Sequence, residues 1–251
     1  MSESFAGDFA LLLERGGLAR AERHSDRAEV AGAHGTTVIA VKFDSGVLNV
    51  GDRRATAESM ILYDRADKIL PLDDHTLIAL SGSYAKAMEA VQFLKHTFKY
   101  YRRSQLQEMS LEGKLAEVTR FLSGNLGSAL GGGGVVLPLL SAFDTGSGEG
   151  RLFFYDAMGA RFESAEFGAA GSGSHRIRGA FDYIVKTKRP FSEMSLDGAL
   201  HEALVLLGIA ADLDAATAGF AKIPPTVKTV TAEGIRVMEE DELGEAIARL
   251  G

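Results

Sequence analysis

The chain has 251 residues, of which 46% are hydrophobic and 24% charged, an ordinary globular composition that allows a substantial core. A formal net charge of -7 argues against a nucleic-acid partner, and the absence of cysteine excludes disulfides and thiol chemistry. Because no apolar run is long enough to span a bilayer, we expect no membrane partner.

The composition changes at residue 35. Residues 1–35 hold an apolar patch around Phe5, Phe9 and 11–13, followed by a charged stretch rich in Ala and Gly that ends at Gly35. Composition alone favours a plain tail. The alternative is a pro-segment that is cut off between Gly35 and Thr36, which would leave residues 36–251 as the mature domain.

Strands dominate the chain from residue 36. β-Branched and alternating residues predict strands at 36–43, 47–50, 68–72 and 76–80, with turns at 44–46 and 73–75. Residues 55–67 carry no clear pattern, and we expect them to be irregular.

Two helices should follow these strands. Apolar residues recur at helical spacing from Tyr84 to Tyr101, and again from Leu111 to Leu130 after Ser110, a plausible N-cap. The four glycines at 131–134 predict a loop. They lack the following Lys-Ser/Thr and the preceding strand of a phosphate-binding loop.

The second half of the chain repeats this order. It predicts strands at 135–143, 151–155 and 160–165, a Gly/Ser-rich segment at 168–174, helices at 174–188 and 195–209, a loop at 212–219, a hairpin of 227–230 with 235–238, and a helix at 239–250. This order is unlike an alternating βαβ chain. It predicts an α+β fold, a four-layer αββα sandwich of two antiparallel sheets flanked by helix pairs.

Most hydrolytic chemistries lack their residues here. The six histidines show no HExxH pattern or metal-ligand spacing, and no GxSxG motif is present, so we expect no metal and no cofactor. A threonine hydroxyl remains, activated by its own α-amine, whose pKa is about 7.7–8.0. Lys68 is a candidate for a nearby cation, and Asp52 for its partner.

An ordered set of short motifs resembles the β-type subunit of the 20S proteasome, closest to the actinobacterial kind. The motifs begin at Thr36, Gly51, Lys68, Ser81 and Gly171, and Asp52 and Lys68 follow Thr36 at intervals of 16 and 32 residues. The resemblance covers residues 36–251 and implies an N-terminal-nucleophile hydrolase fold. Composition had favoured a plain tail, whereas the resemblance favours cleavage before Thr36.

The resemblance also implies catalytic roles. Thr36 would be the nucleophile and its amine the proton acceptor, while Lys68, held by Asp52, would supply positive charge. The backbone N–H of Gly82 would serve an oxyanion hole, and Ser172 would hydrogen-bond near the Thr36 amine.

A supporting pair would be Asp214 and Thr217. This match is looser, because Ala218 stands where the family usually has glycine, and Asp212 is a competing assignment.

Six positions would line the substrate pocket and favour apolar side chains. These are Ala55, Ala66, Leu70, Leu80, Tyr84 and Met88. Tyr84 stands where the family commonly has a small residue. Tyr84 and Met88 are equally well explained as the start of an apolar helix stripe.

The implied protein is a cytoplasmic threonine endopeptidase that cleaves its own Gly35–Thr36 bond. By resemblance it would form homo-heptameric β rings between α-type rings in a 28-subunit core particle, with an ATPase regulatory ring and polypeptide substrates. Two alternatives are the peptidase of a two-ring ATP-dependent protease and a non-catalytic ring subunit. The first usually has Gly-Asp-Gly where this chain has Gly51-Asp52-Arg53, and the intact Thr36, Asp52 and Lys68 argue against the second.

Overall fold

The computed structural model describes residues 36–57, 60–220 and 223–250. The expected pro-segment, including Gly35 and the bond that would be cut, lies outside these residues.

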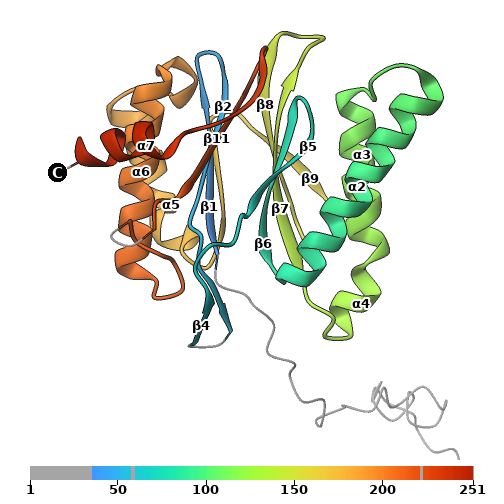
Figure 1. The fold of residues 1–251 in the computed structure, drawn as a ribbon, viewed down its shortest axis with the longest axis horizontal. Helices are drawn as coiled ribbons and strands as arrows, with labels where there is room; N and C mark the ends of the chain where they lie inside the picture. The colour runs from blue at the N-terminus through green and yellow to red at the C-terminus, as the bar shows by residue number, and fades with distance from the viewer. Residues whose placement is uncertain (1–35, 58–59, 221–222, 251) are drawn as a thin grey trace, which may run out of the picture. The chain divides into compact units, whose positions relative to one another are not determined.

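Two five-stranded antiparallel sheets pack face to face in the described part of the chain (Figure 1). In the first sheet the order is β10 (Phe167–Gly171), β1 (Thr37–Phe43), β2 (Gly46–Gly51), β11 (Thr226–Thr231) and β12 (Gly234–Val237). In the second it is β5 (Ile69–Asp73), β6 (Thr76–Gly82), β7 (Val136–Asp144), β8 (Glu149–Tyr155) and β9 (Arg161–Ser164).

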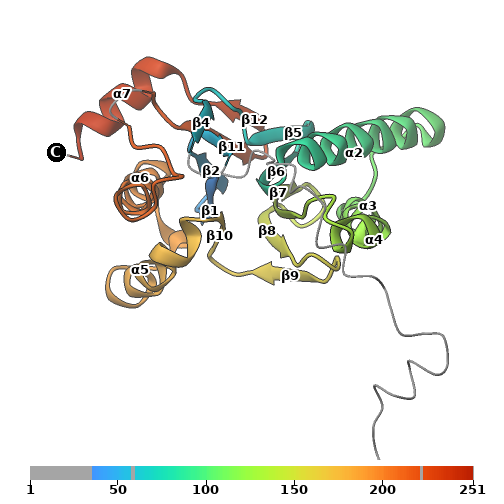
Figure 2. The ribbon, with the colours of Figure 1, turned by 90° about the horizontal axis from the view of Figure 1, so that it is seen from below.

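Helices cover the outer face of each sheet, as Figure 2 shows. Beside the first sheet lie α5 (Ser174–Thr187), α6 (Leu196–Leu213) and α7 (Glu240–Ala248), with a short 3-10 turn at Phe191–Glu193. Beside the second lie α2 (Tyr84–Gln105), α3 (Leu111–Gly124) and α4 (Leu126–Leu130). The predicted αββα sandwich is confirmed.

Alternation along β1 explains the layers. Ile39, Val41 and Phe43 pack with the helix-side core of the first sheet, while Val38 and Ala40 belong to the core between the sheets. Since successive side chains of a strand point to opposite faces, one apolar strand joins two cores.

The expected elements differ from the structure in several details. Residues 55–67 are not all irregular, because β3 (Ala55–Ala57) and β4 (Met60–Tyr63) form a two-stranded sheet of their own. All four residues of β4 are exposed and apolar, so no polar alternation revealed the strand.

The helix expected at 111–130 ends at Gly124, and α4 begins after Asn125, whose side-chain amide donates to the Phe121 carbonyl. The Gly/Ser-rich segment contains β10, which exists through its pairing with β1. Among the described residues, no helix is long and apolar enough to cross a membrane.

Candidate active site

Thr36 immediately precedes β1 and is buried, with 6% of its surface exposed. The next residue, Thr37, exchanges backbone contacts with Asp52, which follows β2. The Asp52 N–H donates to the Thr37 carbonyl at 3.1 Å, and the Thr37 N–H donates to Asp52 Oδ1 at 2.7 Å. The β1–β2 hairpin therefore brings Asp52 to the residue next to Thr36.

Lys68 approaches the same carboxylate from the second sheet. Its Nζ lies 2.8 Å from Asp52 Oδ1 and also donates to the Arg54 carbonyl. The two side chains are 2% and 0% exposed. A buried ion pair loses much hydration energy, so it persists only with close geometry and further hydrogen bonds.

Asp52 has those additional bonds. Its Oδ2 accepts the Arg54 N–H at 3.0 Å and the Ala218 N–H at 3.3 Å. With Thr37 and Lys68 on Oδ1, four donors occupy about all the acceptor positions that a carboxylate offers. The carboxylate is therefore held in one orientation by three separate chain segments.

Burial lowers the pKa of Lys68 below its ordinary value, and the charge of Asp52 opposes this effect. Arg54 lowers the same pKa further, while Asp214 raises it. The result is a cation that deprotonates more readily than a surface lysine, next to the first residues of β1.

A second polar cluster surrounds Asp214, which follows α6. Its Oδ2 accepts the Ser172 hydroxyl at 2.5 Å and the Thr217 hydroxyl at 2.7 Å, and its Oδ1 accepts the Ala216 N–H at 3.2 Å. Asp212, the competing assignment, is exposed within α6. The structure therefore brings Asp214, and not Asp212, to Ser172 and Thr217.

The hydroxyl of Thr37 joins this cluster to β1. It lies 2.7 Å from the Thr217 hydroxyl and accepts the Gly173 N–H at 3.1 Å. Since the one proton of the Thr217 hydroxyl goes to Asp214, Thr37 donates to Thr217. The two hydrogen bonds therefore run in one direction, with Thr37 donating to Thr217 and Thr217 donating to Asp214.

Burial alone would raise the pKa of Asp214. Hydrogen bonds from Ser172, Thr217 and the Ala216 N–H outweigh it, so the pKa lies below its ordinary value. These donors favour the charged carboxylate.

The peptide of Thr36 is held by the loop after β10. Its carbonyl accepts the Ser172 N–H at 2.9 Å, and the Ser172 hydroxyl lies 3.4 Å from it. A Cβ at Gly171 would lie 1.9 Å from that carbonyl oxygen, and Gly171 has a φ of +101°. Only glycine fits a left-handed backbone this close to Thr36.

Gly82 ends β6, beside the strand that Lys68 precedes. The Leu80 N–H donates to the Lys68 carbonyl at 2.9 Å, which sets Gly82 two residues beyond this contact. Its φ is +95°, and a Cβ would lie 2.1 Å from the Val135 carbonyl. The structure thus gives a steric and conformational reason for glycine at this position.

The predicted pocket residues come from several elements. Leu70 and Leu80 pack in the apolar cluster under α2, while Ala55 lies in β3 and Ala66 is buried before β5. Met88, on α2, is half-buried.

Tyr84 begins α2 and is about one-third exposed. Burial raises the pKa of Tyr84, and the charges of Asp67 and Tyr63 raise it further. Neither Tyr84 nor Met88 is among the residues of α2 that are fully buried.

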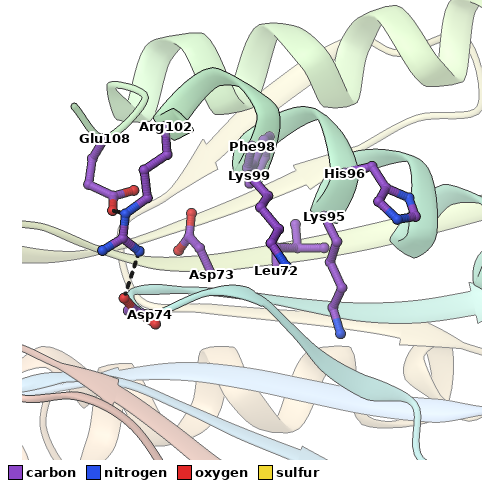
Figure 3. Close-up of a pocket in the computed structure, with 9 residues that line it drawn as sticks. All are labelled: Leu72, Asp73, Asp74, Lys95, His96, Phe98, Lys99, Arg102 and Glu108. Carbon is purple, nitrogen blue, oxygen red and sulfur yellow. Dashed lines mark hydrogen bonds and ion pairs between the residues drawn. The ribbon is translucent and has the colours of Figure 1, made fainter. Parts of the chain in front are cut away.

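A separate pocket of about 390 Å³ lies at the other end of β5 (Figure 3). Lys95, Lys99 and Arg102 of α2 line it together with Asp73 and Asp74, and Arg102 pairs with Asp74 at 3.4 Å. Because Lys68 precedes β5 whereas Asp73 ends it, this pocket is distinct from the cluster around Thr36.

Two residues in these contacts were not expected from the sequence. Thr37 had no expected role, and Gly171 was named only as the start of a motif. The signals were present in the repeated threonine and in a glycine before Ser172, but their partners are far away in the sequence.

Comparisons with known proteins give one consistent result. The family model described as Proteasome subunit matches residues 33–223. Proteasome subunit beta 2 of Thermomonospora curvata is 37% identical over 215 residues, covering 84% of this chain and 75% of the relative. Proteasome subunit beta of Parafrankia sp. is 35% identical over 218 residues, covering 86% and 77%.

Proteasome subunit beta of Stackebrandtia nassauensis is 35% identical over 226 residues, covering 87% of this chain and 78% of the relative. The family model covers the whole second sheet, strands β10, β1 and β2 of the first, and all the residues grouped around Thr36. The chain therefore belongs to the proteasome subunit family.

Proposed function

We propose that this chain is the catalytic β subunit of a 20S proteasome core particle and acts as a threonine endopeptidase. Its family membership supports a subunit of the proteasome core with peptidase activity at the general level. The observation that carries the finer assignment is the buried Lys68–Asp52 pair, whose carboxylate accepts the N–H of Thr37, the residue directly after Thr36.

In the proposed reaction, the Thr36 hydroxyl attacks the scissile carbonyl. The α-amine of Thr36 takes the hydroxyl proton and later passes it to the leaving amine. Lys68 provides positive charge beside the developing alkoxide, and the N–H of Gly82 stabilises the oxyanion. The product is an ester on Thr36, which water hydrolyses to return the free hydroxyl.

Activation uses the same hydroxyl. In the precursor Thr36 has no free amine, so the site lacks its base. The hydroxyl attacks the Gly35 carbonyl, the acyl group moves from nitrogen to oxygen, and water hydrolyses the ester. This releases residues 1–35 as a pro-segment and frees the Thr36 amine.

The proposed setting is the cytoplasm. Seven-membered rings of this subunit would stack between rings of α-type subunits, and an ATPase ring would deliver unfolded or tagged polypeptides. Confinement of Thr36 inside the particle would protect folded proteins from cleavage.

The deciding experiment replaces the nucleophile. The full chain is co-expressed with its α-type partner as wild type, Thr36→Ala and Thr36→Ser, and each particle is assayed with fluorogenic peptides and by intact mass. We expect Thr36→Ala to lose roughly 10⁴-fold or more of the activity and to retain Met1. Thr36→Ser keeps a hydroxyl and an amine, and is expected to cleave itself and retain measurable activity.

Two results would contradict the proposal separately. Peptide cleavage by the Thr36→Ala particle would contradict the assignment of Thr36 as the nucleophile. An active wild-type particle whose chains still begin at Met1 would contradict the proposed cleavage between Gly35 and Thr36.

A further inference from the structure

A lysine occupies an unusual position in β11. Side chains of this strand alternate, and Val230, two residues after Lys228, belongs to the apolar core between the sheets. Lys228 therefore emerges on the same inter-sheet face, and it is buried. A buried lysine at such a position requires compensating contacts.

The Lys228 ammonium group reaches the second sheet. Its Nζ lies 2.7 Å from Asp67 Oδ2 and 2.6 Å from the Ile69 carbonyl oxygen. Asp67 and Ile69 are the two neighbours of Lys68 in the sequence. The Lys228 side chain from the first sheet thus binds the residue before Lys68 and the residue after it.

The Ile69 carbonyl lies on an open edge. β5 is the edge strand of its sheet, and the Lys68 carbonyl faces β6, where it accepts the Leu80 N–H. Successive carbonyls of a strand point in opposite directions, so that of Ile69 faces away from β6 and has no strand partner there. Lys228 supplies a charged donor to this carbonyl.

Asp67 completes a small ring around Lys68. Its Oδ1 accepts the Ile69 N–H at 3.2 Å, while its Oδ2 binds Lys228. The backbone of Lys68 is therefore held by Leu80 on one side and by the Asp67–Lys228 contacts on the other. Because this backbone is restrained, the Lys68 side chain has fewer ways to approach Asp52.

We propose that Lys228 is a positioning residue for the peptidase reaction, which holds Asp67 and Ile69 so that Lys68 stays aligned with Asp52. This inference rests on the proposed function of Lys68. Lys228 does not contact the reacting atoms in this proposal, and it acts only through the start of β5.

The proposal predicts an effect on the pH dependence of the reaction. Among the described residues, the charges of Asp52 and Asp214 favour the protonated form of Lys68, whereas the charge of Arg54 opposes it. If the start of β5 loosens, the contact with Asp52 weakens while Lys68 remains buried. Lys68 then loses its proton at lower pH.

The test compares three variants of the full chain, assembled with its α-type partner. Lys228→Met keeps the length of the stem but removes the donor and the charge, whereas Lys228→Arg keeps both. Asp67 is 41% exposed, so water can solvate it after its partner is removed, and the Lys228→Met chain should still fold.

Lys114→Met is the matched control. Lys114 is about as buried as Lys228, and it pairs with Asp73 at 2.7 Å at the opposite end of the same strand. Asp73 is less exposed than Asp67, at 14% against 41%, so Lys114→Met should lose at least as much stability as Lys228→Met, while misalignment of Lys68 should affect only Lys228→Met.

We expect Lys228→Met to lower kcat about tenfold with little change in KM, because it misplaces a group needed in the transition state. The alkaline limb of its kcat/KM profile should move down by about half a pH unit or more. Lys228→Arg should restore both, and Lys114→Met should keep the wild-type profile. Hydrogen exchange at residues 67–70 should become faster in Lys228→Met only.

Wild-type kcat and pH profile in Lys228→Met would overturn the positioning role, as would unchanged exchange at residues 67–70. If the Thr36→Ala particle cleaves peptides, or the wild type does not, the proposed function fails instead. The exchange measurement then still decides whether Lys228 restrains this segment.

Discussion

At the scale of single residues, Asp52 connects the parts of the candidate site. Its carboxylate binds the backbone after Thr36, the ammonium group of Lys68 and two further N–H groups from Arg54 and Ala218. Because the Asp52 side chain is fully buried, water cannot replace a lost partner. Stability and the proposed chemistry therefore depend on the same group.

Replacement of Asp52 by Asn should make this dependence measurable. The change leaves Lys68 buried without a counter-charge, so the free energy of unfolding should fall by roughly 3–5 kcal/mol and peptide cleavage should be lost. Denaturant unfolding and a fluorogenic peptide assay would measure the two effects.

A double variant separates stability from chemistry. Asp52→Leu with Lys68→Met removes both charges and should recover much of the unfolding free energy, but no activity. Activity in this double variant would contradict the proposed role of Lys68.

Asp214 should contribute to the pH dependence of the protein's stability. Its pKa in the folded protein lies below the ordinary value of 3.8, because donors from Ser172, Thr217 and Ala216 outweigh the effect of burial. A carboxyl with a lowered folded-state pKa stabilises the protein above its unfolded pKa. This contribution is lost as the pH falls through the folded-state pKa.

The Asp214→Asn variant lacks this contribution. Its melting temperature should be below that of the wild type at neutral pH, and the difference should shrink as the pH falls below about 4. Asp212→Asn, exposed and two residues earlier, should follow the wild-type curve. A difference between Asp214→Asn and wild type that stays constant from pH 7 to pH 3 would contradict this account.

At the scale of elements, the pairing of β1 with β10 brings the two polar clusters together. Thr37 pairs with Gly171, and the loop that follows supplies Ser172 to the Thr36 carbonyl and Gly173 to the Thr37 hydroxyl. The close approach is possible because Gly171 has no Cβ. The strand therefore ends in the geometry that the site requires.

Gly171→Ala should disturb this junction strongly. Its Cβ would overlap the Thr36 carbonyl oxygen, and the left-handed backbone adds strain, so we expect a loss of about 2 kcal/mol or more. Thermal unfolding would measure the loss. Gly179→Ala is the control, because Gly179 lies in α5 with nothing within 4 Å of a Cβ, and should gain roughly 0.5–1 kcal/mol. Equal stability of the two variants would contradict the proposed close approach.

At the scale of the whole molecule, β4 is the unusual surface. Met60, Ile61, Leu62 and Tyr63 are between 51% and 66% exposed, on both faces of a strand whose only strand partner in the described residues is β3. Contiguous exposed apolar residues indicate contact with other chains. Members of the proteasome subunit family assemble into multi-subunit cores, and we expect β4 to contribute to assembly.

Ile61→Lys with Tyr63→Lys should reduce the fraction of full-size particle without unfolding the chain. Both side chains are already exposed, so the folded subunit loses little buried area, whereas a contact between subunits would bury charge. Native mass and circular dichroism would measure the two properties. Ile61→Val with Tyr63→Phe keeps the apolar surface and should assemble normally, and full-size particles from the lysine variant would contradict the expectation.

The sequence alone was sufficient for the layered fold, because strand alternation and helical spacing are local properties. It was insufficient for β4 and β10. The residues of β4 are all apolar and exposed, and β10 is a glycine-containing strand that exists through its pairing with β1. Neither strand carries the alternation on which such a prediction depends.

The candidate site divides in the same way. The intervals between Thr36, Asp52 and Lys68 could be read along the chain, as could the glycine that ends β6. Only the tertiary structure decided that Asp214, and not Asp212, meets Ser172, that Thr37 reaches Thr217, and that Lys228 binds both neighbours of Lys68. These contacts join residues between 42 and 180 positions apart, and no local pattern encodes which distant donor will satisfy a buried carboxylate or an edge carbonyl.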